Sequence, residues 1–364
     1  MPRKWPSHWG KLNLGVSDRL NSVDFIKGIG IISFILWHCY DYFYITSSLR
    51  PPLGRFILYT TGIFIFMSGF IVGYHYYQKY IKASESDRHF INNRLYIRAM
   101  KLVCYVFIAN LASNIIINKN IGVNIIKQTV YLLISLLYTD RWDISFQVLV
   151  VIAFGLMLSP LILRLEAHDK VFTTEILIVI ISACCFYDVF NMSRIPYLWR
   201  YLPLSLTGMI LGIYFKNIKF QGWNENNRYI YLTCFLGLCL AAAIFPRWYK
   251  YILMETGPYL ILIISVFLSL NRIASKFIEQ HFMLPHIISR GLVFIGQYSL
   301  FIYFTQIIII LFISELNRGR RFETSTNIII LSVLVLIISI ILTYVTSFIR
   351  KYYYVEKVYK FLFL

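Results

Sequence analysis

The sequence predicts an all-α, polytopic membrane protein, and three of its properties support this. Of its 364 residues, 58% are apolar and only 14% are charged, a composition far more apolar than that of soluble globular domains. The apolar residues form runs of about 17–25 residues, the length that crosses a bilayer as a helix. The polar stretches between these runs are short. A soluble enzyme and a disordered chain are therefore both excluded.

Ten apolar runs are long enough to span a bilayer. They cover residues 25–45, 56–77, 99–117, 144–163, 171–190, 199–215, 229–245, 252–270, 291–313 and 326–349. A further segment, residues 121–138, contains Lys127, and we expect it to form an amphipathic helix on the outer surface. The predicted organisation is a cytoplasmic segment 1–24, a ten-helix membrane domain 25–349 and a cytoplasmic tail 350–364.

The net charge of +18 comes from Lys and Arg residues that lie between the apolar runs. With ten spans and both termini in the cytoplasm, 23 of the 35 basic residues are cytoplasmic and 12 are external, as the positive-inside rule requires. Counting residues 121–138 as an eleventh span reduces this bias to 19 against 15 and places Lys127 in the membrane. The charge is thus explained by topology, and no nucleic-acid partner is predicted. The first 24 residues are polar and do not resemble a cleavable signal peptide.

The cysteines do not indicate a disulfide framework or a metal cluster. They form no CxxC pair and have no histidine at zinc-ligand spacing. All six lie in or next to apolar runs, so we expect buried thiols and no bound metal: Cys39, Cys104, Cys184, Cys185, Cys234 and Cys239.

The first apolar run carries four ionisable residues on one predicted helix face. Lys27 and His38 are eleven residues apart, which places them on the same face and about 16 Å apart along the axis. Asp24 lies one turn before Lys27, and Asp41 lies one turn after His38. Ionisable groups at membrane depth are costly and usually functional. This stripe is therefore the first candidate site.

Two interpretations of the stripe are open from this helix alone. In the first, His38 is a neutral general base, Asp41 orients its ring, and Lys27 binds the phosphates of a donor at the cytoplasmic mouth. In the second, His38 is a packing residue and Lys27 extends its ammonium to the membrane interface.

The spacing Lys27-x10-His38 resembles the first-helix signature of the acyltransferase 3 family. This family comprises multi-span membrane proteins that O-acylate bacterial surface polysaccharides and other extracytoplasmic acceptors. Four later segments resemble other motifs of the family, in the family's order: residues 66–70, 93–98, 202–212 and 296–306. Ten spans with both termini in the cytoplasm also agree with this family.

Several positions depart from the family pattern. Arg94 and Arg98 have three residues between them, where the family has R-x-x-R. Gln306 stands where many relatives have histidine, which argues against a catalytic role at this position. Trp142 begins a partial match to a Trp-x-Leu-x-x-Glu motif, in which Gln147 replaces the glutamate or the glutamate is absent. No fused extracytoplasmic domain is seen, so we expect the membrane domain or a separate partner to acylate the acceptor.

The resemblance implies an O-acetyltransferase of the bacterial inner membrane. Its donor would be cytoplasmic acyl-CoA, by default acetyl-CoA, and its acceptor a hydroxyl of a surface polysaccharide such as an O-antigen, or of the lipid-linked precursor. Lys27, Arg94 and Arg98 would bind the phosphates of the donor, because guanidinium and ammonium groups suit phosphate. His38 and Asp41 would be catalytic.

The predicted substrate-binding residues are Asp24, Trp37, Ser68 and Trp142, although helix packing is the favoured role of Ser68. The rival function is an exporter of polysaccharide or lipid-linked sugar, or another secondary transporter, since ten spans with buried charges also describe carriers. A carrier would show helix interruptions in matching halves. The prolines of this chain are not paired in this way. The stripe on the first span and the paired arginines favour the enzyme.

Overall fold

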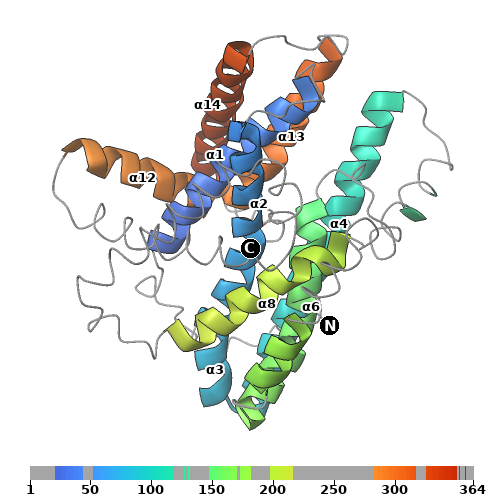
Figure 1. Cartoon of the computed structure of the whole chain (residues 1–364), viewed down its shortest axis with the longest axis vertical. Coiled ribbons are helices and arrows are strands. Elements are labelled where there is room, and N and C mark those ends of the chain that lie inside the picture. Colours follow the sequence, from blue (N-terminus) through green and yellow to red (C-terminus); the bar gives the residue numbers. More distant parts are fainter. Residues whose placement is uncertain are drawn as a thin grey trace.

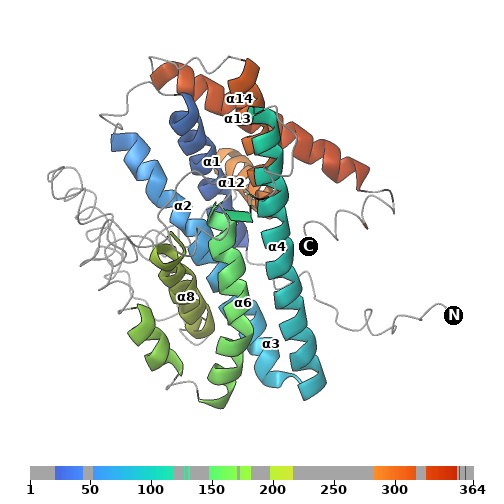
Figure 2. The same cartoon turned by 90° about the vertical axis from the view of Figure 1, so that its right-hand side faces the viewer.

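A computed structural model describes residues 21–43, 52–118, 147–169, 173–181, 197–215, 283–316 and 325–350, together with positions 127, 130, 131, 352 and 357. All of the regular structure within these residues is helical, as predicted (Figures 1 and 2). Its elements are α1 (Asn21–Phe43), α2 (Pro52–Ile71), the π-helical turn η3 (Val72–Tyr76), α3 (Tyr77–Lys82), α4 (Glu85–Asn118), α6 (Gln147–His168), α8 (Tyr197–Phe215), α12 (Met283–Gln297), α13 (Ser299–Leu316) and α14 (Ser325–Ile349).

Four of these helices are long and apolar enough to cross a membrane: Asn21–Tyr40, Val148–His168, Ser299–Leu316 and Thr326–Ile349. A shorter apolar helix covers Tyr201–Tyr214. The chain is therefore an integral membrane protein. The count of ten spans stays a prediction, because residues 229–245, 252–270 and most of 121–138 lie outside the described residues.

The predicted span 291–313 is wrong as a single helix. The structure divides it into α12 and α13, which meet at Tyr298. In Figure 1, α12 runs crosswise to α13 and α14. This orientation lets α12 lie directly against α1, where a Cβ atom at Gly28 or Gly296 would overlap main-chain atoms of the other helix. The break cannot be predicted from the sequence, because the whole run is apolar and hydropathy carries no information about the direction of a helix.

Helices α2 and α8 approach closely through two pairs of glycines. Gly69 and Gly73 lie on α2 and η3, and Gly208 and Gly212 lie on α8, each pair with GxxxG spacing. A Cβ atom on any of the four would overlap a main-chain carbonyl of the opposite helix. Small residues at this spacing let membrane helices pack backbone to backbone. This contact fixes one wall of the helical bundle.

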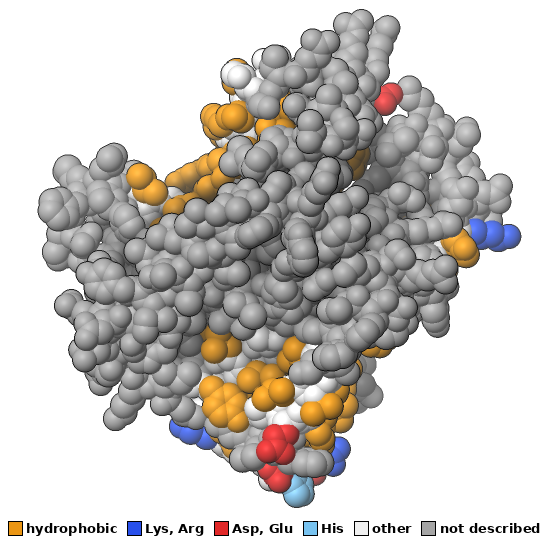
Figure 3. Space-filling view, in the orientation of Figure 1, with side chains coloured by type: hydrophobic (Ala, Val, Ile, Leu, Met, Phe, Trp, Pro, Cys, Tyr) orange, Lys and Arg blue, Asp and Glu red, His pale blue; other side chains and the backbone are white. Residues whose placement is uncertain are grey.

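The outward face of α14 is apolar, as a lipid-facing helix requires. Its exposed residues include Ile330, Leu334, Ile337, Ile341, Tyr344 and Phe348. In contrast, the turn between α3 and α4 is polar, and Figure 3 shows acidic, basic and histidine side chains gathered at one end of the molecule. Ser84 caps α4 by accepting a hydrogen bond from the Asp87 amide, 3.3 Å away. The polar end belongs to the loop predicted to face the cytoplasm.

The prediction of buried thiols is confirmed for one cysteine and wrong for another. Cys39 is buried, whereas Cys104 is exposed on α4. Both are free thiols. Their helical positions explain the difference, because α1 contacts α2, α12, α13 and α14, whereas α4 packs mainly against α6. The other four cysteines lie outside the described part of the chain.

Candidate functional site

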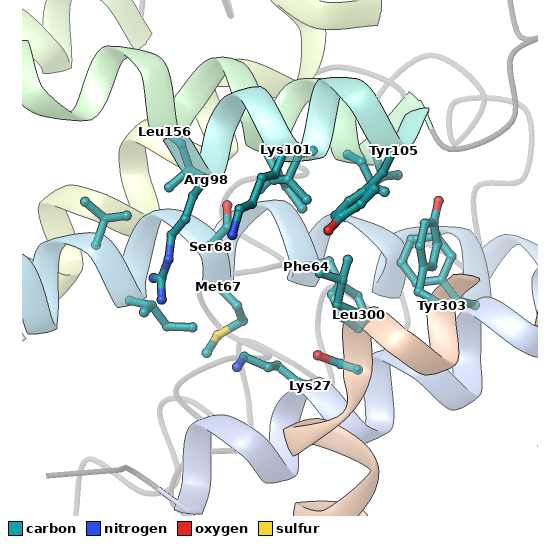
Figure 4. A pocket seen from close by; sticks show the side chains of 18 of the residues that line it. Lys27, Phe64, Met67, Ser68, Arg98, Lys101, Tyr105, Leu156, Leu300 and Tyr303 are labelled. Carbon is teal, nitrogen blue, oxygen red and sulfur yellow. The ribbon is translucent and has the colours of Figure 1, made fainter. Parts of the chain in front are cut away.

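A cavity of about 330 Å³ lies between α1, α2, α4, α6 and α13 (Figure 4). Most of its lining is apolar. Three cations, Lys27, Arg98 and Lys101, are also part of the lining, and the described lining residues include no aspartate or glutamate. A mostly apolar pocket with a few convergent charged groups is the usual form of a small-molecule site.

The three cations come from opposite walls. Arg98 and Lys101 extend into the cavity from α4, and Lys27 extends toward them from α1 (Figure 4). The Lys27 ammonium lies 3.3 Å from the carboxylate of Asp24, which is 2% exposed. The two residues are one turn apart on the same face of α1, as their spacing predicts. Asp24 offsets one of the three positive charges, so the group retains an excess of two, and the cavity favours an anionic ligand.

Arg98 is held by a residue of the π-helical turn. Its Nη1 donates a hydrogen bond to the hydroxyl of Tyr76, 2.5 Å away. Tyr76 is the last residue of η3 and also lines the cavity. Single π-helical turns inside α-helices frequently occur at functional sites. Here the turn carries the hydroxyl that contacts the guanidinium.

The other end of the cavity is aromatic. The Phe34 ring lies edge-on to the rings of Phe64 and Tyr303, with both centroid distances 5.2 Å. Phe34 follows Lys27 by seven residues, which corresponds to about 10 Å along α1. Tyr105 also follows Arg98 by seven residues on α4, and it lines the cavity. The cationic and aromatic ends are therefore about two helical turns apart on both walls.

His38 lies directly behind the aromatic end. Its ring centroid is 5.7 Å from that of Phe34 and 6.4 Å from that of Tyr303. His38 Nε2 is buried, and among the described residues it has no hydrogen-bond partner. Buried polar atoms are nearly always hydrogen-bonded, so this nitrogen is a candidate to contact a substrate hydroxyl. The geometry brings the imidazole next to the cavity without making it part of the lining.

Of three other predicted site residues, one lines the cavity and two do not. Ser68 lines the cavity, but its hydroxyl donates to the carbonyl of Ile65 at 2.7 Å. Trp37 and Arg94 are half-buried and do not belong to the lining. Arg94 lies one turn before Arg98 on α4.

Two predicted residues stay untested. The backbone of Asp41 belongs to α1, but its side chain is outside the described part of the protein, so its contact with His38 stays a prediction. Trp142 also lies outside the described residues.

The lining residues that were missed in the sequence include Phe34, Tyr76, Lys101 and Tyr303. Lys101 had a readable signal, because it follows Arg98 by three residues and so shares its helix face. Tyr303 belongs to the segment 296–306, but no feature of the sequence indicates which helix it faces. Gln306, one turn later, is fully buried, and neither of its amide atoms has a hydrogen-bond partner among the described residues.

A family model described as an acyltransferase domain, that of the acyltransferase 3 family, matches residues 20–347. The match includes all of the cavity-lining residues and His38. No curated protein and no solved structure matches the chain.

Proposed function

Since the chain belongs to the acyltransferase 3 family, we propose that this membrane acyltransferase moves an acetyl group from cytoplasmic acetyl-CoA to a polysaccharide hydroxyl. The acceptor is a cell-surface polysaccharide, such as an O-antigen, or its lipid-linked precursor. One observation carries the proposal: a single cavity joins a cluster of cations to the aromatic wall beside His38.

The cationic end suits the phosphates of an acyl-CoA. Lys27, Arg98 and Lys101 line this end, and Arg94 lies one turn from Arg98. Phosphate oxygens form charge-assisted hydrogen bonds with guanidinium and ammonium groups, which are stronger than neutral ones. The remaining lining is mostly apolar and suits the largely uncharged pantetheine arm. Bound in this way, the donor directs its thioester toward Phe34, Tyr303 and His38.

His38 acts as the general base in this proposal. Its buried Nε2 accepts the proton of the acceptor hydroxyl as the hydroxyl oxygen attacks the thioester carbonyl carbon. The new C–O bond forms, the tetrahedral intermediate collapses, and the C–S bond breaks. The thiolate of CoA leaves and takes up the proton from His38. Asp41, three residues later, orients the imidazole through its side chain.

The direction of transfer follows from the proposed topology. With a cytoplasmic N-terminus, α1 places Lys27 near the cytoplasmic face and His38 deeper in the membrane, since eleven residues span about 16 Å. The donor thus enters from the cytoplasm of the inner membrane, and the acceptor reaches His38 from the outer face.

The test compares surface polysaccharide from cells with the gene, without it, and with His38→Ala. We expect an acyl mass difference that base treatment removes in the first strain and its absence in the other two, with normal membrane abundance of the variant. Wild-type acylation by His38→Ala would exclude the catalytic role. Loss of the polysaccharide itself on deletion, rather than of its acyl groups, would instead indicate an exporter.

A further inference from the structure

The aromatic end of the cavity is closed by Phe34. This side chain is 2% exposed and lies between Phe64 and Tyr303, with its ring edge-on to both. It lines the cavity on one side and contacts the His38 ring on the other. Phe34 is therefore a lining residue that lies directly against the imidazole.

Three residues of α1 show that the aromatic wall, which is formed by Phe34, Phe64 and Tyr303, lies on the path of the donor. Lys27 lines the cationic end, Phe34 follows two turns later, and His38 follows after one more turn. A donor whose phosphates contact Lys27 must bring its carbonyl carbon close to Phe34 to come within reach of His38. The acyl chain attached to that carbon then meets the rings of Phe34 and Tyr303.

The aromatic wall belongs to the packed interior of the protein. Phe34 belongs to the main hydrophobic core together with Ile31, Ile35 and Tyr303, and cores at native density do not accept additional methylenes without strain. From these contacts we propose that Phe34 sets the acyl-chain length of the donor and restricts the enzyme to two- to three-carbon groups. This inference rests on the proposed function, because it assumes an acyl thioester in the cavity.

The experiment measures the chain-length profile of purified full-length protein in lipid nanodiscs. The donors are acetyl-CoA, butyryl-CoA and hexanoyl-CoA, and the acceptor is surface polysaccharide isolated from cells that lack the gene. Ester formation is measured by mass spectrometry. We expect the wild type to prefer acetyl over butyryl by at least about 10-fold, the scale on which a pocket distinguishes a methylene.

Phe34→Ala is expected to raise the ratio of butyryl to acetyl transfer by at least about 10-fold and to permit hexanoyl transfer. Phe34→Leu, which keeps more of the packing, is expected to give an intermediate profile. It also keeps the test decisive if the alanine variant does not fold. A wild-type ratio in a folded Phe34 variant would overturn the inference.

Leu156→Ala is the matched control. Leu156 lines the cavity near Arg98, at the cationic end (Figure 4), so its truncation enlarges the cavity away from the acyl group. Whatever its effect on the rate, it should leave the chain-length ratio unchanged. An equal change of ratio in Leu156→Ala would contradict a specific role of Phe34. Absence of transfer from every donor by the wild type would instead overturn the proposed function itself.

Discussion

The hydroxyl of Tyr76 accepts a hydrogen bond from the guanidinium of Arg98, 2.5 Å away. The contact joins the π-helical turn η3 to α4, and both side chains line the cavity. Arg98 also lies within 5.9 Å of the Tyr76 ring. A long, flexible arginine side chain is thereby held on the cavity side of α4 before any ligand binds.

Tyr76→Phe is expected to weaken donor binding without affecting the chemical step. The variant removes one hydrogen bond but keeps the aromatic ring, so the lost free energy is about 1 kcal/mol. The KM for acetyl-CoA should rise about 3- to 10-fold while kcat stays within about 2-fold. Steady-state kinetics in nanodiscs measure both values. A lower kcat with an unchanged KM would show that Tyr76 does not act through Arg98.

Lys101→Ala is expected to raise the KM for acetyl-CoA by about 10-fold, because it removes one of the three cations that line the cavity. The matched substrate is S-acetylpantetheine, which has no phosphate, and its KM should not change. Lys101→Arg keeps the charge and should restore most of the affinity for acetyl-CoA. An equal effect on both donors would mean that Lys101 does not bind phosphate.

Arg98→Ala and Arg94→Ala should both raise the concentration of acetyl-CoA needed for half-maximal rate, but by different amounts. Arg98 lines the cavity and Arg94 does not. We expect about 10-fold or more for Arg98→Ala and less than about 5-fold for Arg94→Ala, since a charge farther away is more strongly screened. Unchanged donor dependence in both variants would remove the two arginines from the site.

Gly69→Val tests the close contact of α2 with α8. Its Cβ atom would overlap the carbonyl of Ser205, so we expect a loss of at least about 2 kcal/mol of stability through overpacking. The control is Gly291→Ala on α12, where a Cβ atom would have no atom from the other described segments within 4 Å. It should be neutral, or stabilising by up to about 1 kcal/mol. Thermal unfolding in detergent compares the two, and equal melting temperatures would contradict the packing described.

Gln306→Leu tests whether this buried amide acts in the reaction. Each unpartnered buried polar atom costs about 1–3 kcal/mol, so an apolar replacement of similar size should leave the stability equal or higher. Acetyl transfer should be retained, because glutamine at this position argues against catalysis. Loss of transfer at normal melting temperature would show that Gln306 binds a substrate instead.

The sequence alone determined the properties that depend on local patterns. Hydropathy and charge predicted a helical membrane protein, and the order of its motifs predicted the family. The placement of Lys27 and His38 on one helix face could be predicted from the helical period alone. The predicted runs 199–215 and 326–349 nearly coincide with α8 and α14, whereas α4 begins 14 residues before the predicted run 99–117.

The neighbours of that face depend on how separate helices pack together. The break at Tyr298, the cavity that joins Lys27 to Lys101, and the aromatic wall of Phe34, Phe64 and Tyr303 all depend on contacts between separate helices. Phe34 and Tyr303 are far apart in the chain. An apolar run indicates that a helix is buried in lipid or in protein. Its hydropathy is the same whichever helix lies beside it, so the neighbours of each helix face are decided by packing alone.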